Sequence, residues 1–394
     1  MLLAAIFCAF AALLPVVCVV APKGTVVLLL LAAVMAIPTY WWMHRRFPIP
    51  DLRISIVLAL LVVWCAIASG WSDDPTRSLL LTLRVAVLFA AGMALFPVVA
   101  ALNEVAKNYI CLWLIAGSAL SLVLMVVEMG LGYPTVHTFK ELSEGREAIA
   151  FNRGAIALSM ITWPVVAFLW NRGIGWKALA IPVVLGTLSV FLESAAATLG
   201  FLVGVASVLI IVCQRKMGRL TTLAACVVAF IALPFAMREM HKYEWHRADW
   251  LSQSEQHRVE IWNFSLERIA EKPVFGWGFD ESRHIAKLFF GADESSRSMV
   301  PLHPHNGPLQ ILLELGSVGA VIALALLWLI AHQLERLPGR ARECSQALFV
   351  ASLAVGCVAF GQWQNWWIAL IFSVALLVPL TATPSTGVGA NRIQ

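Results

Sequence analysis

The sequence predicts an all-α protein that crosses a membrane about twelve times. The 394 residues are 60% hydrophobic and only 13% charged, whereas a soluble domain carries about twice that charged share. The mean hydropathy is +0.82. Apolar runs of about 20 residues recur from one end of the chain to the other, and each can cross the hydrocarbon core as a helix. The runs are continuous and do not alternate with polar residues, which excludes a strand barrel.

The apolar runs define the predicted spans in chain order. They are residues 2–21, 25–43, 54–70, 79–100, 109–131, 155–170, 177–192, 195–213, 220–237, 308–332, 345–361 and 365–382. We do not expect the first span to be a cleaved signal peptide, because it lacks a basic leading region and a second span follows almost at once.

The lysines and arginines of the short loops predict the orientation. With the N-terminus inside, the inner loops hold Arg45, Arg46, Arg53, Lys107, Arg172, Lys177, Arg215, Lys216, Arg219, Arg336, Arg340 and Arg342. The outer loops hold fewer, namely Lys23, Arg77, Lys140, Arg146 and Arg153. Both termini are therefore expected in the cytoplasm, and the long segment 238–304 is expected outside. The net charge of +5 follows from this bias and does not indicate nucleic-acid binding.

We expect one membrane domain, residues 1–394, into which a polar segment, 238–304, is inserted between the ninth and tenth spans. Within that segment, Ser254 is the predicted N-cap of a helix that runs to Glu271 and stops before Pro273. Apolar residues at helical spacing predict that this helix rests on the membrane or on the bundle. They are Val259, Trp262, Leu266 and Ile269. A second short helix is expected around 281–290, followed by a mobile loop at 291–300.

The tenth span begins beside two histidines, His303 and His305. Pro308 suits the first position of a helix, with Asn306 or Gly307 as its cap. The unpaired N–H groups at such a helix start favour anions, especially phosphate. A neutral imidazole such as His305 is well suited to take a proton from a sugar hydroxyl near pH 7. The alternative is an interfacial histidine that is held by a hydrogen bond.

The same span continues with small residues at helical spacing, Gly316, Gly319 and Ala323. This spacing predicts a face against which another helix packs closely. Glu314 lies among them, and we interpret it, like Glu128 and Glu193, as a structural acid. The sequence does not name the partners of these acids.

Four arginines are candidates for binding phosphate, which Arg contacts bidentately. Arg153 precedes the sixth span, and Arg258 and Arg268 lie on the predicted loop helix. Arg84 lies about one and a half turns inside the fourth span, where a charged side chain is costly. The alternatives are solvated surface charges and, for Arg84, snorkelling to the interface.

No metal site is predicted. His303 and His305 could chelate an ion together with His257 or His284, but their spacing matches no standard zinc signature. Asp73-Asp74 could serve a divalent cation, although such a pair before a proline is more often a turn. The eight cysteines lie in spans or at span ends, which indicates neither a disulfide framework nor a thiolate metal site.

Three motifs together resemble one family. His305-Asn306, nine residues, and then Gly316 and Gly319 resemble the signature of bacterial O-antigen ligases. The segment 151–155 (FNRGA), and the pair 258–262 (RVEIW) and 273–278 (PVFGWG), are similar to the wider superfamily of O-antigen ligases and polymerases. The likeness covers essentially the whole chain, including the large outer loop before the histidine motif.

The resemblance implies a glycosyltransferase fold of the C type in a bacterial inner membrane, with its active site on the periplasmic face. It implies transfer of a polysaccharide from undecaprenyl diphosphate to a sugar hydroxyl of lipid A-core, with inversion and without a metal or other cofactor. His305 would be the base, and Arg258 and Arg153 would hold the departing diphosphate. The residues expected to bind substrate are Arg84, Asn306, His303, Arg268 and Trp262, with Gly316 and Gly319 as the structural part of the motif.

Three other functions remain open at this point. A Wzy-type polymerase would use the same donor and a growing lipid-linked chain as acceptor. A protein O-oligosaccharyltransferase would glycosylate a protein. A transporter is the alternative from another class, and it would need no glycan acceptor. Against it, the chain has no repeat relating two halves and no pair of interrupted helices in corresponding positions.

Overall fold

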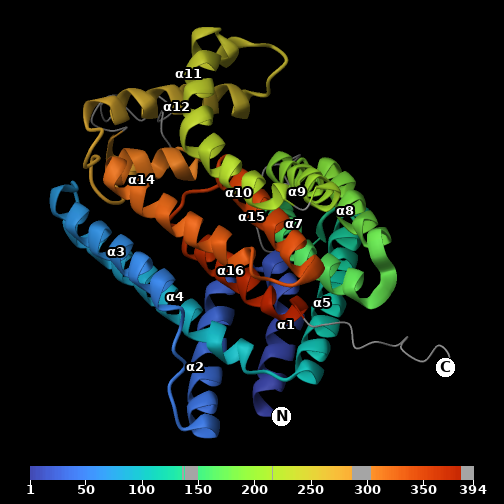
Figure 1. Ribbon diagram of the computed structural model, residues 1–394. Helices are drawn as coiled ribbons and strands as arrows, with labels where there is room; N and C mark the ends of the chain where they lie inside the picture. Colours follow the sequence, from blue (N-terminus) through green and yellow to red (C-terminus); the bar gives the residue numbers. More distant parts are fainter. Residues whose placement is uncertain (135–136, 138–149, 215, 286–302, 383–394) are drawn as a thin grey trace, which may run out of the picture.

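The computed structural model describes residues 1–134, 137, 150–214, 216–285 and 303–382, and within them every regular element is a helix (Figure 1). The helices are α1 (Leu2–Val20), α2 (Gly24–His44), α3 (Leu52–Ala68), α4 (Pro75–Ala100), α5 (Glu104–Gly130), α7 (Asn152–Leu169), α8 (Ala180–Phe191), α9 (Ala195–Cys213), α10 (Met217–Val227), α11 (Leu233–Lys242), α12 (Gln253–Glu271), α14 (Gly307–Leu334), α15 (Gly339–Gly356) and α16 (Asn365–Leu377). The predicted all-α membrane fold is confirmed.

Eleven of the twelve predicted spans each fall on one of these helices, and the ninth, 220–237, runs from α10 into α11. Ten helices in the described part of the chain are long and apolar enough to cross a membrane, as judged by length and composition. Two differences explain why the described part of the chain has ten such helices and the sequence predicts twelve spans. Residues Asn152–Phe191 form one helical stretch, although the chain turns between α7 and α8 at Gly173 and Gly175, where φ is positive. Helix α15 begins with charged residues, so its composition is less apolar.

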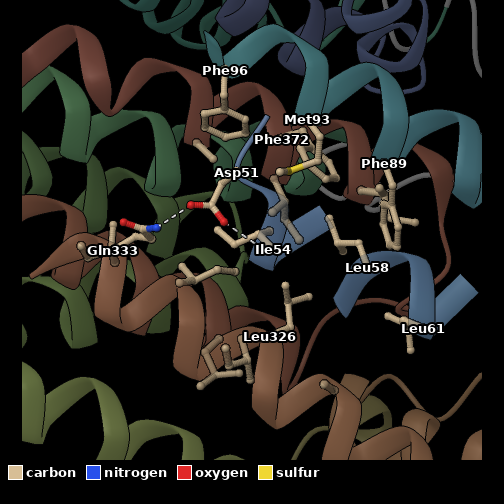
Figure 2. Close-up of a pocket in the computed structure, with 18 of the residues that line it drawn as sticks. Asp51, Ile54, Leu58, Leu61, Phe89, Met93, Phe96, Leu326, Gln333 and Phe372 are labelled. Atoms are coloured by element: carbon tan, nitrogen blue, oxygen red, sulfur yellow. Dashed lines mark hydrogen bonds between the residues drawn. The ribbon is translucent and has the colours of Figure 1, made fainter. Parts of the chain in front are cut away.

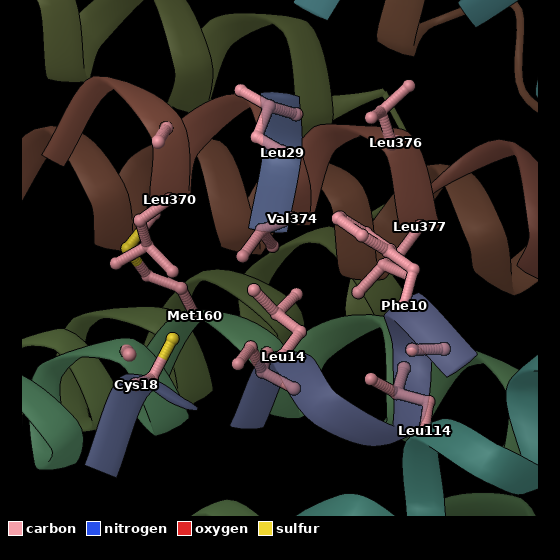
Figure 3. Close-up of a cluster of buried hydrophobic side chains, with 14 of the residues drawn as sticks. Phe10, Leu14, Cys18, Leu29, Leu114, Met160, Leu370, Val374, Leu376 and Leu377 are labelled. Atoms are coloured by element: carbon pink, nitrogen blue, oxygen red, sulfur yellow. The ribbon is translucent and has the colours of Figure 1, made fainter. Parts of the chain in front are cut away.

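The core of the bundle lies around α1, which packs against α2, α5 and α7. Figure 3 shows Phe10 and Leu14 of α1 beside Leu29, Leu114 and residues of α16. Inside a membrane such contacts stabilise by close packing, because lipid tails are as apolar as the side chains. Gly117 of α5 shows how close the helices approach, since an added Cβ there would overlap the carbonyl oxygen of Ala12.

Helix α12 lies across the start of α14 and beside α11 at one end of the bundle, while the N-terminus lies toward the other end (Figure 1). We call the end with α12 the loop side. The helix begins at Ser252, not at the predicted Ser254, because Ser252 and Glu255 form a reciprocal capping box. The predicted apolar stripe is confirmed, since Val259 and Trp262 are buried and Trp262 packs against Leu309. The helix therefore rests on the bundle.

The predicted helix at 281–290 is present as one turn from Ser282 to Ile285, and its remainder lies outside the described residues. The loop expected at 291–300 also lies outside them.

Helix α14 is broken at Gly316, whose φ of 64° and ψ of −164° only glycine adopts readily. Residues 273–278 run beside the break. Backbone hydrogen bonds join the two segments from Trp277 N to Leu313 O, Gly278 N to Glu314 O, Ser317 N to Pro273 O and Val318 N to Val274 O. Trp64 Nε1 donates to the Leu315 carbonyl at 3.0 Å. Every backbone group that these bonds satisfy would otherwise be costly at membrane depth.

Another helix does pack against this span, since α3 lies along α14, but the atoms nearest to Gly316 and Gly319 belong to a loop and to α14 itself. An added Cβ at Gly316 would overlap the backbone of Val274 in the adjoining loop, and one at Gly319 would overlap Leu315 of the same helix. The two glycines thus allow a break in α14 and its contact with a loop.

Candidate functional site

His305 stands on the loop side, just before α14, with its backbone in the left-handed region at a φ of 54°. Only a few per cent of residues other than glycine adopt a positive φ, and such conformations gather at functional sites. Its neighbours hold it on both sides. Trp262 Nε1 donates to the Pro304 carbonyl at 3.1 Å, and Asn306 Oδ1 accepts from Leu309 N at 2.9 Å as the N-cap of α14.

The His305 ring has a defined tautomer. Its Nδ1 lies 2.9 Å from the carbonyl oxygen of Ala359, and a carbonyl can only accept, so Nδ1 carries the hydrogen. The lone pair is then on Nε2, which is the atom that can take a proton. Burial, followed by the charges of Arg258 and His257, lowers the pKa of His305 below its usual value, although the Ala359 bond opposes this. The ring is therefore neutral near pH 7.

Arg258 is anchored beside His305. Its Nη1 donates to the Val358 carbonyl at 3.0 Å, one residue before the carbonyl that holds His305. The side chain is largely withdrawn from water, and burial lowers its pKa, while Glu255 raises it. A partly desolvated guanidinium binds anions more strongly than one in bulk water. The structure thus brings together the predicted pair Arg258 and His305 on the turn that follows α15.

His303 packs against His305, with the ring centroids 4.3 Å apart. Its Nδ1 accepts from the backbone N–H of His305 at 3.2 Å, and its Nε2 lies 2.9 Å from the side-chain amide of Gln364. Burial, and then the charges of His305 and Arg283, lower the pKa of His303 to about 3. His303 is uncharged and supports the backbone turn of its neighbour.

Arg153 is connected to this group through aromatic and amide side chains. Its guanidinium lies over the Trp366 ring, 5.4 Å from the centroid, a distance typical of a cation–π contact. Trp366 Nε1 donates to Gln364 Oε1 at 2.7 Å, and the amide of Gln364 contacts His303. The start of α7 is therefore linked to the histidine turn, as the sequence predicts.

Glu314 has partners that the sequence could not name. It is fully buried and accepts hydrogen bonds from three separate segments. The donors are Ser282 Oγ, Ser282 N at 3.4 Å, Asp280 N at 3.2 Å, Gln310 Nε2 at 3.0 Å and Trp363 Nε1 at 2.7 Å. Gln310 Oε1 also accepts from Gln362 N at 2.7 Å. Glu314 thus holds α14, residues 280–282 and the chain before α16 together beneath the histidine turn.

Two of the predicted substrate-binding arginines lie elsewhere. Arg84 lies on a cavity of about 290 Å³ together with Arg77 and Arg283, both of which pair with Asp280. Arg268 forms an ion pair with Glu271 at 2.9 Å, ten residues and about 15 Å along α12 from Arg258. Among the described contacts, neither Arg84 nor Arg268 touches His305.

Asn306 and Trp262, which were predicted to bind substrate, have structural roles, and Asn306 is the helix cap that the sequence also allowed. Asn306 is completely buried as the helix cap. Trp262 is buried, and its indole N–H donates to the Pro304 carbonyl. Both residues position the histidine turn.

An apolar cavity of about 630 Å³ runs beside α14. Its loop-side end is lined by Pro308, Gln362 and Trp363, and its other end by Asp51, Gln333 and Arg336. Figure 2 shows the Asp51–Gln333 hydrogen bond at that far end and the side chains of α3, α4, α14 and α16 around the space. Because the 28 residues of α14 extend over about 40 Å, the cavity crosses much of the bundle and ends near the histidine turn.

That the reaction proceeds without a metal stays a prediction. In the described part of the chain, the histidines 303 and 305 do not belong to a cluster of metal-ligating groups, whereas Asp73, Glu281 and His284 do. Asp74 caps α4 by accepting from Arg77 N at 3.0 Å, which is the turn role that the sequence suggested for the Asp-Asp pair.

Comparison with known proteins bears directly on this site. Residues 181–324, which run from α8 into α14, match the family model described as O-antigen ligase. Over this part the chain is similar to O-antigen ligases. The matched part contains Arg258, His303 and His305 together with the break at Gly316, whereas Arg84 and Arg153 lie outside it.

Alignments over most of the chain show that it is similar to proteins of Rickettsia species. One from Rickettsia felis, named a putative polysaccharide ligase, is 27% identical over 332 residues, covering 82% of this chain and 80% of that protein. Those of Rickettsia typhi and Rickettsia conorii bear the same description. They are 24% identical over 87% of this chain and 85% of the relative, and 25% identical over 84% and 81%. These similarities and the ten apolar helices of the described residues support a multi-pass membrane protein with an O-antigen ligase type of function.

Proposed function

We propose that this protein is an O-antigen ligase, which transfers a polysaccharide from undecaprenyl diphosphate to a sugar hydroxyl of lipid A-core with His305 as the general base. The observation that carries the proposal is the orientation of His305. Its Nδ1 is bound to the Ala359 carbonyl, which leaves the basic Nε2 available, and the partly buried Arg258 is anchored on the preceding carbonyl, that of Val358. A base and an anion-binding group are thereby held side by side.

The reaction is a single displacement. His305 Nε2 takes the proton of the acceptor hydroxyl as the oxygen attacks the anomeric carbon of the donor sugar. The new glycosidic bond forms while the bond from that carbon to the diphosphate oxygen breaks, so the configuration inverts. Arg258 and Arg153 stabilise the negative charge of the departing diphosphate, and such electrostatic stabilisation is often the largest catalytic contribution.

The donor supplies the energy of the reaction through its diphosphate linkage, so no nucleotide is needed, and the proposed transfer is independent of a metal or organic cofactor. The 630 Å³ apolar cavity supports a lipid-linked donor, since it ends at Pro308 and Gln362 near the histidine turn. A polyprenyl tail in this cavity would place its diphosphate at Arg258. The loop side then faces the periplasm of a bacterial inner membrane, and both termini lie in the cytoplasm.

The test is a reconstituted transfer assay with purified protein, undecaprenyl-diphosphate glycan and lipid A-core in the presence of EDTA. Wild type is compared with His305→Ala and with the matched control His332→Ala, which alters a histidine near the far end of α14. We expect glycan-bearing lipid A from wild type and His332→Ala, and none from His305→Ala. Equal product from His305→Ala would refute the assigned base.

The same assay separates the alternatives. If lipid A stays bare while carrier-linked chains lengthen, the enzyme is a polymerase of the Wzy type. If glycan appears only on an added protein acceptor, it is a protein O-oligosaccharyltransferase. If glycan crosses the vesicle membrane without transfer, it is a transporter. The names of the relatives favour the ligase.

A further inference from the structure

Three potential metal ligands converge on the loop side of the bundle, apart from the histidine turn. Asp73 lies before α4, and Glu281 and His284 lie in the segment that follows α12. One ligand atom of each residue lies within 4.8 Å of the others. His284 Nδ1 is 3.7 Å from Glu281 Oε2 and 3.9 Å from Asp73 Oδ2.

The arrangement around Glu281 is specific. Its side chain is buried, and Oε2 accepts from Ser72 Oγ at 3.1 Å and from Asp73 N at 2.8 Å. These two bonds orient the carboxylate toward His284. A carboxylate that has left water needs a compensating positive charge.

No arginine or lysine among the described residues forms an ion pair with Glu281. The neighbouring Arg77 and Arg283 both pair with Asp280, at 3.2 Å and 3.1 Å. His284 faces Glu281 and Asp73, but both distances are too long for a hydrogen bond. Its Nδ1 is buried and has no hydrogen-bond partner. The buried Nδ1 of His284 therefore faces two carboxylate oxygens without a hydrogen bond to either.

We propose that Asp73, Glu281 and His284 bind one divalent metal ion, with Zn²⁺ as the preferred ion. One imidazole and two carboxylates suit zinc, whereas calcium and magnesium favour oxygen ligands alone. Zinc ligands lie about 2.0–2.2 Å from the ion, and hence roughly 3.3–3.6 Å from each other in a tetrahedron. The two separations from His284 Nδ1, 3.7 Å and 3.9 Å, need to close by only a few tenths of an ångström. The exposed side of Asp73 leaves the fourth position to water.

The ion would serve structure. It would join the turn before α4 to the segment 279–285, which Glu314 also holds against α14. This would fix Asp280, and with it the arginines that Asp280 binds. None of the three ligands takes part in the proposed glycan transfer, so the site neither requires nor contradicts a metal-independent reaction.

The test is zinc binding by the purified full-length protein in detergent, after EDTA treatment and removal of the chelator. Competition with a zinc-sensitive dye gives affinity, elemental analysis gives stoichiometry, and thermal unfolding gives stability. The variants are His284→Ala and Asp73→Asn. The matched controls are His332→Ala and Asp249→Asn, which change a histidine and an exposed aspartate outside the cluster.

We expect about one zinc per chain and a higher unfolding temperature with zinc than with magnesium for wild type and both controls. Each of the two cluster variants should bind zinc at least about tenfold more weakly and lose the thermal shift. Size-exclusion profiles matched to wild type confirm that the variants are folded. Wild type without bound zinc, or cluster variants that bind zinc like wild type, would overturn the proposal. Glycan transfer is not a readout here, so this result stands apart from the transfer assay.

Discussion

Arg258 and His305 donate to two consecutive carbonyl groups, those of Val358 and Ala359, at 3.0 Å and 2.9 Å. One comes from α12 and the other from the turn before α14, yet the same short turn after α15 holds both. Successive Cα atoms of a chain are 3.8 Å apart, so this turn sets the spacing between the proposed base and the proposed diphosphate ligand. The two side chains are therefore positioned as a unit.

We predict that Arg258→Ala costs as much activity as His305→Ala. General-base catalysis contributes about 10²–10⁴-fold, and loss of one group that stabilises developing negative charge costs about 10²–10³-fold. The measurement is kcat/KM in the reconstituted assay, with Arg46→Ala, an exposed arginine after α2, as control. Near-normal turnover by Arg258→Ala would show that its role is assigned wrongly.

The acid limb of the pH profile should lie below the ordinary histidine value of about 6.5. Transfer needs neutral His305, and its pKa is lowered by burial first and then by the charges of Arg258 and His257. The neutral form therefore persists as the pH falls through 6.5, and activity is lost only below it. In Arg258→Gln the residual activity should show an acid limb shifted upward, because a charge that lowers the pKa has been removed. A limb at or above 6.5 in wild type would contradict the assignment.

Glu314→Gln should lower stability by about 1–3 kcal/mol. The carboxylate accepts from the donors of Ser282, Gln310 and Trp363 as well as from backbone N–H groups. A glutamine keeps one acceptor oxygen and turns a donor toward the others, which leaves buried polar groups unpaired. The thermal midpoint in detergent measures the loss. Glu104→Gln, which removes only an exposed ion pair with Lys107, should change it little.

Gly316→Ala should be far more destabilising than Gly339→Ala. Both glycines have a positive φ, 64° and 53°, so both alanines are strained. Only at Gly316 would the added methyl group also overlap the backbone of Val274, whereas nothing lies within 4 Å of one at Gly339. The comparison of thermal midpoints isolates the overlap from the strain. Equal thermal midpoints would show that the backbone of Val274 does not contact α14 closely at Gly316.

Much of the fold could be predicted from the sequence, because membrane helices are long apolar runs whose backbone N–H and C=O groups bond within the same helix. The start of α14 was readable for a local reason, since Asn306 and Pro308 are a cap and a first-turn residue. The start of α12 was misplaced by two residues. The deciding signal was present, because Ser252 precedes Glu255 by three positions and Ser254 has no such partner.

The site was readable only in part. His305 was found because a local motif carries it. Its contact with Ala359, and the contact of Arg258 with Val358, join segments far apart in sequence, and no periodicity encodes them. The break at the motif's glycines could not be predicted, because small residues at helical spacing look the same whether they permit a helix contact or a helix break.

The break in α14 has a consequence for how the protein assembles in the bilayer. A continuous helix satisfies its own backbone groups, whereas a broken one inside the membrane leaves several unpaired, each at a cost of several kcal/mol. The partners that remove this cost belong to residues 273–278. We therefore expect the tenth span to enter the bilayer unbroken, and to open only when that loop reaches it. Maturation of the site would then be a late, cooperative event, after the hydrophobic helices are already in place.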